Sequence, residues 1–374
     1  MNTMYQKRRA DLVTWMARKS ISVVLLEDTE GRREKAIRYF SGHPGDALLA
    51  ITVTGHAVLC PWDINLAERM SDVDVVIPYS DFGRHPVTAA AGIIESIGVP
   101  ANSRIEIPGH TPYPLFLQYV GTLLEHVVLC RETEGVFEEI SRMRSIKDES
   151  EIAIIESACA LTDTIINLLE KQIRSGKIKT ELDAAMFIEH TARESGADGT
   201  GFETLAAGSD RSYSIHPVPA YTNAKIGTTG LSILDFGIMI GGYTSDVTLT
   251  LACGKINPTQ EKLIGLVEKA YAAAILKYTP GTLTREASLA ADAVFKRSKK
   301  SMPHALGHGI GLEPHEGPAI RNRIENEWVF EPGMVVTLEP GLYDPLHGGC
   351  RLENDILITE EGNRVLTNSR IIRI

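Results

Sequence analysis

The stretch Ile233–Thr250 reads ILDFGIMIGGYTSDVTLT and joins two short apolar runs through a glycine pair, Gly241-Gly242. This pattern predicts a β-hairpin. Each run carries one acid, Asp235 and Asp246, and their midpoint beside Gly241 predicts that a tight turn sets them directly opposite each other. Directly paired Cβ atoms lie roughly 4.5–5.5 Å apart, where like charges repel, and burying an unpaired carboxylate is costly. A metal ion between the acids would remove both costs; the alternative is a hairpin whose acids face solvent.

Length and composition narrow the class of protein around this hairpin. The chain has 374 residues, which suits two domains. Its net charge of −10 argues against a nucleic-acid or anionic-membrane binder, because both need clustered Lys and Arg. The five cysteines are scattered without a CxxC spacing, which indicates reduced thiols. With neither a secretory signal nor an apolar run of about 18 residues in view, we expect a cytoplasmic protein without a membrane span.

The first 145 residues alternate strand-like and helix-like segments, which predicts a mixed α/β domain. They contain neither a phosphate loop nor a dinucleotide glycine fingerprint. A charge-rich segment follows, and Asp148 begins a long helix with Glu151 at the capping-box position. We therefore place the domain boundary near Ser145. From Gly199 onward the sequence becomes β-rich, with many glycines.

Four further stretches in the second half carry chemically useful side chains. They are Ser214–Pro217 (SIHP), His304–Pro318 (HALGHGIGLEPHEGP), Met334–Tyr343 (MVVTLEPGLY) and Arg351–Thr359 (RLENDILIT). Glu339 ends one apolar strand and Glu353 begins the next, so both acids project from sheet elements, as Asp235 and Asp246 do. With His308 they form a donor set of four carboxylates and one imidazole. That set suits Mn, Co, Fe or Zn, and four carboxylates match the charge of two divalent ions held about 3.5–4 Å apart.

These motifs resemble the prolidase / Xaa-Pro aminopeptidase branch of the pita-bread metallopeptidases. The resemblance lies in Leu234–Thr250, His308–Pro318, Met334–Tyr343 and Arg351–Thr359, in this order along the chain. Two smaller marks agree, AIRYFSG at residues 36–42 and MRSIKDESE at residues 143–151. The resemblance implies a creatinase-like α/β N-terminal domain at residues 1–145. It implies an α+β pita-bread catalytic domain, built around a curved antiparallel sheet, at residues 146–374.

The resemblance also implies roles for individual residues. Asp235, Asp246, His308, Glu339 and Glu353 bind two metal ions, with Asp246 and Glu353 shared between them. Glu339 also carries the proton, as base and then acid. His216 and His315 contact the scissile peptide and stabilise the tetrahedral intermediate. His304 lines the proline side, and Arg351 stands beside Glu353; a supporting role behind the ligands is the alternative for both.

The implied activity is hydrolysis of the bond between an N-terminal residue and proline in short peptides. The enzyme would be an aminopeptidase or a dipeptidase. Its metal would be Mn²⁺, with Co²⁺ or Zn²⁺ as alternatives, and the resemblance implies a homodimer. Three rivals remain: a methionine aminopeptidase, which lacks such an N-terminal domain; a metal-free creatinase-like C–N hydrolase; and a non-catalytic pita-bread binding protein. The last two are not expected to keep all five ligands.

Two positions depart from the pattern of this family. Leu249 stands where an arginine is usual, which raises the question of local charge balance and substrate anchoring. Asn354 stands where an acid usually follows the shared glutamate. Neither position is a ligand, so we expect metal binding to survive both changes.

Overall fold

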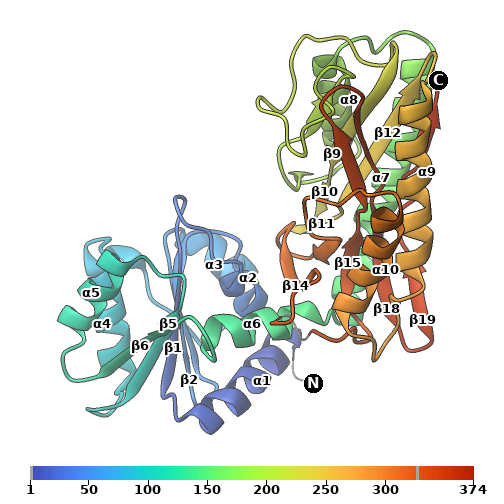
Figure 1. Ribbon diagram of the computed structural model, residues 1–374. Helices are drawn as coiled ribbons and strands as arrows, with labels where there is room; N and C mark the ends of the chain where they lie inside the picture. The colour runs from blue at the N-terminus through green and yellow to red at the C-terminus, as the bar shows by residue number, and fades with distance from the viewer. Residues whose placement is uncertain (1–2, 326–327) are drawn as a thin grey trace. The chain divides into compact units, whose positions relative to one another are not determined.

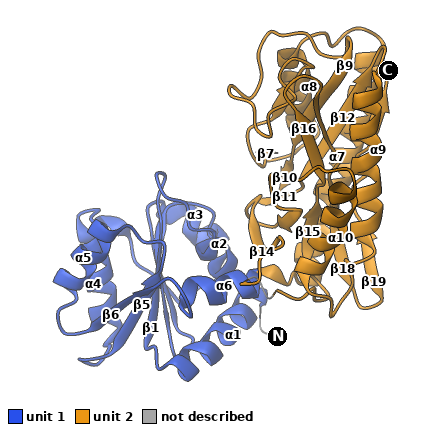
Figure 2. Cartoon of the chain, viewed as in Figure 1, with its two compact units in different colours: residues 1–144 blue, residues 145–374 orange. Residues whose placement is uncertain are grey.

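The computed structural model describes residues 3–325 and 328–374, and the chain divides into two compact units (Figures 1 and 2). The N-terminal unit comprises residues 1–144 and the C-terminal unit residues 145–374. The sequence places the boundary one residue later.

The N-terminal unit is built on a six-stranded mixed sheet in the order β4-β3-β2-β1-β5-β6. Its strands are β1 (Val23–Asp28), β2 (Ala47–Thr52), β3 (Ala57–Pro61), β4 (Val75–Val76), β5 (Arg104–Pro108) and β6 (Val127–Arg131). Its helices are α1 (Met4–Lys19), α2 (Lys35–Ser41), α3 (Ile64–Met70), the 3₁₀ turn η1 (Tyr79–Phe82), α4 (Pro86–Ile97), α5 (Tyr113–Thr122) and α6 (Val136–Ser145). Every residue of β1, β2 and β3 is buried, as expected for a sheet covered by helices on both faces (Figure 1).

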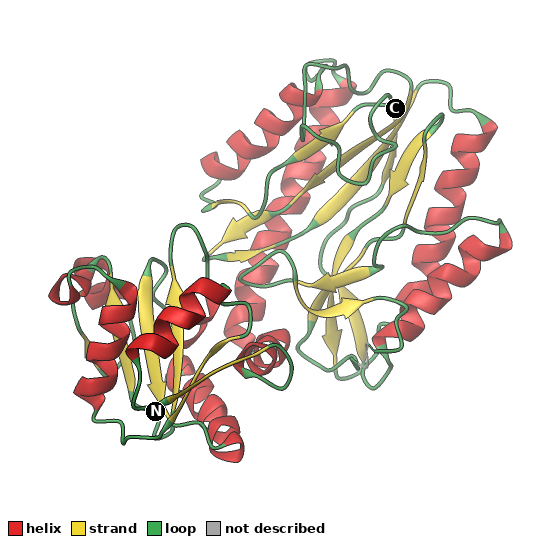
Figure 3. Ribbon diagram, turned by 60° about the vertical axis from the view of Figure 1, so that its left-hand side comes forward, coloured by secondary structure: helices red, strands yellow, loops and turns green. Residues whose placement is uncertain are grey.

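The C-terminal unit holds its strands in several small sheets between two helix pairs (Figure 3). The first half contributes α7 (Glu149–Arg174), α8 (Glu181–Glu194), β7 (Gly199–Thr200), β8 (Leu205–Ala207), β9 (Gly230–Phe236), β10 (Ile238–Ile240), β11 (Tyr243–Thr244) and β12 (Val247–Cys253). The second half contributes α9 (Pro258–Ile275), α10 (Thr284–Arg297), β13 (Gly307–Gly309), β14 (Glu316–Ile320), β15 (Val335–Leu338), β16 (Gly341–Asp344), β17 (Gly348–Arg351), β18 (Asn354–Thr359), β19 (Gly362–Val365) and β20 (Ile371–Arg373).

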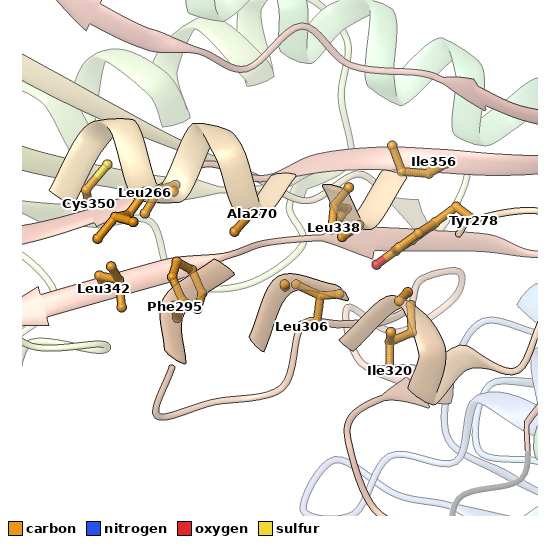
Figure 4. Close-up of a cluster of buried hydrophobic side chains, with 14 of the residues drawn as sticks. Leu266, Ala270, Tyr278, Phe295, Leu306, Ile320, Leu338, Leu342, Cys350 and Ile356 are labelled. Atoms are coloured by element: carbon orange, nitrogen blue, oxygen red, sulfur yellow. The ribbon is translucent and has the colours of Figure 1, made fainter. Parts of the chain in front are cut away.

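Two of these sheets position the site. One has the order β20-β12-β9-β8 and the other β14-β13-β15-β18-β19. Helices α7 and α8 pack on the first sheet through an apolar cluster that includes Ile165, Leu234 and Leu249. Helices α9 and α10 pack on the second through a cluster that includes Phe295, Leu338 and Ile356 (Figure 4). The predicted combination of an α/β N-terminal unit with an α+β C-terminal unit is confirmed.

Helix α7 is the one described helix whose length and composition would allow it to cross a membrane. Its capping box at Asp148 and Glu151 is present as the sequence predicts. The side chains of Ile155, Ile165 and Leu169 on one face of the helix are buried in the core, as in the central helix of a globular unit.

Candidate metal centre and active site

The hairpin at residues 233–250 forms, but with a different register from the predicted one. Strand β9 pairs with β12 so that Asp235 lies opposite Thr248, and Ile240 pairs with Tyr243. The turn is therefore the two residues Gly241 and Gly242, both at positive φ, which suits a two-residue hairpin loop. The prediction that Asp235 and Asp246 face each other directly is wrong. They are diagonal neighbours instead, because side chains alternate and the turn centre lies one residue later than assumed.

Alternation along β12 also answers the question raised by Leu249. Leu249 is fully buried in the apolar cluster beneath α7 and α8. Its neighbour Thr248 points the other way and donates a hydrogen bond from Oγ1 to Glu353 Oε2 at 2.6 Å. Leu249 therefore belongs to the core and leaves the charges on the opposite face of the strand unchanged.

The other three predicted ligands come from the second sheet. His308 lies on β13, and Glu339 and Glu353 lie at the adjoining ends of the paired strands β15 and β18. Glu353 N donates to Thr248 O at 3.2 Å, and this isolated bridge joins the second sheet to β12. The convergence of five residues spread over more than 100 positions thus follows from two sheets meeting at Thr248 and Glu353.

Measured distances place these side chains around one point. Ligand atoms of Asp246, His308 and Glu353 all lie within 4.8 Å of one another. His308 Nε2 is 3.8 Å from Asp246 Oδ2 and 3.6 Å from Glu339 Oε1. This spacing is that of groups able to share a cation.

Asp235 joins this group through Arg351. One carboxylate oxygen of Asp235 accepts a hydrogen bond from Arg351 Nη2, whereas Oδ1 is buried without a hydrogen-bond partner in the described structure. An orphaned buried oxygen is costly. A metal ligand bond would satisfy it, so the donor set and this unpaired oxygen both fit a divalent cation.

Burial and mutual repulsion act strongly on the carboxylates. Burial, and then the charge of Glu353, raise the pKa values of Asp246 and Glu339 well above their usual range. Burial, and then Asp235, raise the pKa of Glu353 to about 7. The ionised forms of these carboxyl groups are therefore disfavoured unless positive charge lies nearby. Divalent ions would supply that charge.

The four predicted histidines lie around this cluster. The ring of His315 is 4.1 Å from that of His308, centroid to centroid. His216 and His315 both line the cavity over the cluster, and burial lowers the pKa of each, so both are neutral. Burial lowers the pKa of His308 to about 3 and that of His304 to about 4, which leaves His308 free to ligate.

His304 has a different environment from His216 and His315. Its Nδ1 lies 3.6 Å from Glu339 Oε2, and its Nε2 lies 3.0 Å from the hydroxyl of Tyr343. It is absent from the described lining of the cavity. This position favours the supporting role that the sequence left open for His304.

The loop that carries His315 is fixed by a buried ion pair. Lys147 Nζ lies 3.4 Å from Glu316 Oε2, with side chains 1% and 5% exposed. The other oxygen of Glu316 accepts from Glu313 N at 3.1 Å. The glutamate beside His315 in the HEGP motif thus anchors the loop.

Three features of the site were not predicted from the sequence. Thr248 supports Glu353, and the buried Asp355 accepts a hydrogen bond from Asp246 N at 3.0 Å. Both lie inside the quoted motifs, and the period-two alternation from Asp246 and Glu353 is the signal that would have found them. The cavity wall formed by Phe202, Glu203 and Val218 lies outside every motif, so only the fold reveals it.

The cluster opens into a cavity of about 400 Å³. A buried set of four carboxylates and a neutral imidazole under such a cavity, flanked by two neutral histidines, is the site of a metal-dependent hydrolase. The fold narrows this class further.

The chain belongs to metallopeptidase family M24: residues 153–360 match this family, and residues 8–146 match the creatinase/prolidase N-terminal domain. The Xaa-Pro dipeptidase of Pyrococcus horikoshii is 30% identical over 361 residues, which cover 96% of each chain. The prolidase of Pyrococcus furiosus superposes with a TM-score of 0.81 at 28% identity, over 96% of this chain and 99% of that one. The X-Pro aminopeptidase of Thermotoga maritima superposes with a TM-score of 0.84 over 98% of this chain and 99% of that one. At 24% sequence identity, this likeness supports the fold only. The predicted family and enzyme class are confirmed.

Proposed function

We propose that the protein hydrolyses the bond between an N-terminal residue and proline, with the catalytic domain at residues 146–374. The relatives named as Xaa-Pro dipeptidases support this activity. The single observation that supports it most is the close approach of Asp246, His308 and Glu353 in the floor of a peptide-sized cavity. The proposed substrates are short peptides with proline at the second position.

The proposed metal ligands are Asp235, Asp246, His308, Glu339 and Glu353, which would hold two divalent ions. Their oxygen-rich set favours Mn²⁺, with Co²⁺ or Zn²⁺ as alternatives. When bound, the ions supply Lewis-acid activation of water and of the scissile carbonyl. Arg351 fixes Asp235, and Thr248 fixes Glu353.

The remaining steps fall to the protein's own groups. Amide hydrolysis needs a proton for the leaving nitrogen, and Glu339 is placed to take one up and return it. His216 and His315, both neutral, line the cavity and donate hydrogen bonds to the developing oxyanion. His304 holds Glu339 in orientation. We further propose a cytoplasmic homodimer, which light scattering on the purified protein tests.

The decisive experiment incubates Ala-Pro, Ala-Pro-Ala and Ala-Ala-Ala with protein loaded with Mn²⁺, Co²⁺ or Zn²⁺, with metal content measured in parallel. We expect cleavage at Ala-Pro bonds, two metal ions per chain, and neither in Asp246→Ala. Stoichiometric metal without cleavage of any proline peptide would overturn the proposal and favour a binding protein.

A further inference from the structure

The cavity above the cluster has one cationic side chain and an additional acid in its wall. Its apolar wall is formed by Phe202, Leu205, Pro217, Val218, Pro219 and Ala220. Glu203 stands in the same wall as an exposed carboxylate. Among the lining residues that the structure describes, Arg351 is the sole Arg or Lys.

The guanidinium of Arg351 is already occupied by neighbours within the chain. Nε donates to Thr248 Oγ1 at 2.9 Å, and Nη1 donates to Ile215 O at 3.1 Å and to the Tyr343 hydroxyl at 2.8 Å. Nη2 binds Asp235, and the residue is 1% exposed. Arg351 is therefore committed to orienting the site and cannot also pair with a substrate anion.

The position of Glu203 follows from the strand that comes two residues later in the chain. Glu203 precedes β8, whose first residue Leu205 pairs with Asp235. The adjacent Phe202 ring packs against Gly237, just after β9: a Cβ added at Gly237 would be 2.9 Å from the ring. The backbone at Glu203 is thus positioned next to the strand that carries the proposed metal ligand Asp235, and its exposed side chain lines the cavity.

This charge arrangement bears on the length of the substrate. In an Xaa-Pro dipeptide the residue after the scissile bond carries a free carboxylate, whereas in a longer peptide an amide occupies that place. The four carboxylates match the charge of the proposed metal ions, and Arg351 is already engaged. A substrate carboxylate placed against the apolar wall therefore loses hydration without a free cationic partner among the described lining residues. A like charge nearby adds repulsion.

We infer that this cavity selects against a free carboxylate next to the scissile bond, and that the protein acts on peptides of three or more residues, with Glu203 as a specificity-determining residue. This inference rests on the proposed proline-directed activity. It assigns the chain to aminopeptidase rather than dipeptidase chemistry, in contrast to the names of several relatives.

The first test compares Ala-Pro, Ala-Pro-NH₂ and Ala-Pro-Ala on the same Mn²⁺-loaded enzyme. The amide removes the negative charge without adding a residue. We expect kcat/KM for the amide and the tripeptide to exceed that for the dipeptide by about tenfold or more. Equal or faster cleavage of the dipeptide would overturn the inference while leaving the proposed function intact, whereas cleavage of none of the three would refute the proposed function itself.

The second test changes the charge of the wall. Glu203→Gln should narrow the ratio of kcat/KM between Ala-Pro-NH₂ and Ala-Pro, and Glu203→Lys should narrow it further. Raising the salt concentration should narrow the wild-type ratio as well, because an exposed charge is screened. Glu194→Lys makes the same charge change as Glu203→Lys at the exposed last residue of α8 and should leave the ratio unaltered. If neither the two Glu203 variants nor added salt changes the ratio of kcat/KM between Ala-Pro-NH₂ and Ala-Pro, the role given to Glu203 is wrong.

Discussion

A buried acid of the N-terminal unit and the acidic cluster of the C-terminal unit have opposite environments. In the N-terminal unit, the fully buried Glu106 receives Arg131 Nε at 3.1 Å, Arg131 Nη2 at 2.6 Å and Val136 N at 2.9 Å. In the C-terminal unit, only Asp235 of the four carboxylates at positions 235, 246, 339 and 353 hydrogen-bonds to Arg351 in the described structure, and one oxygen of Asp235 has no hydrogen-bond partner there. The first arrangement is complete within the chain, and the second is the proposed metal site.

The difference shows that burial of an acid does not by itself mark a functional site. A carboxylate with a bidentate arginine and a backbone N–H is a structural element. Several carboxylates whose pKa values are raised by burial and by one another, under an open cavity, indicate a cation-binding site. Four measurements test this difference between a structural acid and a proposed metal ligand.

The largest effect is expected from Asp246→Ala, because it removes a ligand at the centre of the cluster. Peptide hydrolysis should fall by more than about 1,000-fold. Bound metal, measured by mass spectrometry, should drop below two ions per chain. A variant that retains both metal and activity would show that Asp246 is a structural acid like Glu106.

Glu106→Ala should show the opposite pattern. Removing Glu106 leaves the partly exposed Arg131 and the N–H of Val136 without their acceptor, and should lower the free energy of unfolding of the N-terminal unit by about 2–3 kcal/mol. Denaturant unfolding measures this loss. The metal content of the folded fraction should be unchanged. A loss of metal from the folded protein would contradict the purely structural role given to Glu106.

The metal-free protein should lose stability as pH rises. Glu353 has its pKa raised from 4.5 to about 7, so the folded chain binds this proton more tightly than the unfolded chain. The resulting stability is present below pH 4.5 and is lost as pH rises through about 7, with an upper limit on the order of 3 kcal/mol.

Thermal unfolding in EDTA from pH 4.5 to 8 measures this trend. With Mn²⁺ present the trend should reverse, because metal competes with protons for the same carboxylates. Stability that rises with pH in EDTA would contradict the assignment of these acids as repelling neighbours.

The smallest effect is expected from Thr248→Val, which keeps the shape of the side chain and removes its hydroxyl. Glu353 loses a hydrogen bond of 2.6 Å, so metal affinity should fall about tenfold, as for other groups that support ligands. Titration calorimetry measures it.

Thr250→Val is the matched control, since Thr250 Oγ1 bonds the backbone of Arg351 and touches no ligand. It should lower stability and leave metal affinity unchanged. Equal losses of affinity in both variants would mean that Thr248 acts through general stability.

Much of the site could be read from the sequence because its residues stand in dense local motifs. The GHG around His308, the acid after the strand at Glu339 and the RLEN at Glu353 each place a side chain within or directly next to a short strand, so a local motif marks it. The register of the hairpin could not be read reliably. Moving the turn by a single residue changes which residues face each other, and glycines permit both turns.

The sequence alone determined the fold class, the family and the five candidate ligands, because periodicity and motif spacing are local properties. The tertiary structure alone decided the diagonal placement of Asp235 and Asp246, the bridge from Thr248 to Glu353 and the wall containing Glu203. These features depend on how two sheets meet, and contacts between segments far apart in the chain are set by packing rather than by any local pattern.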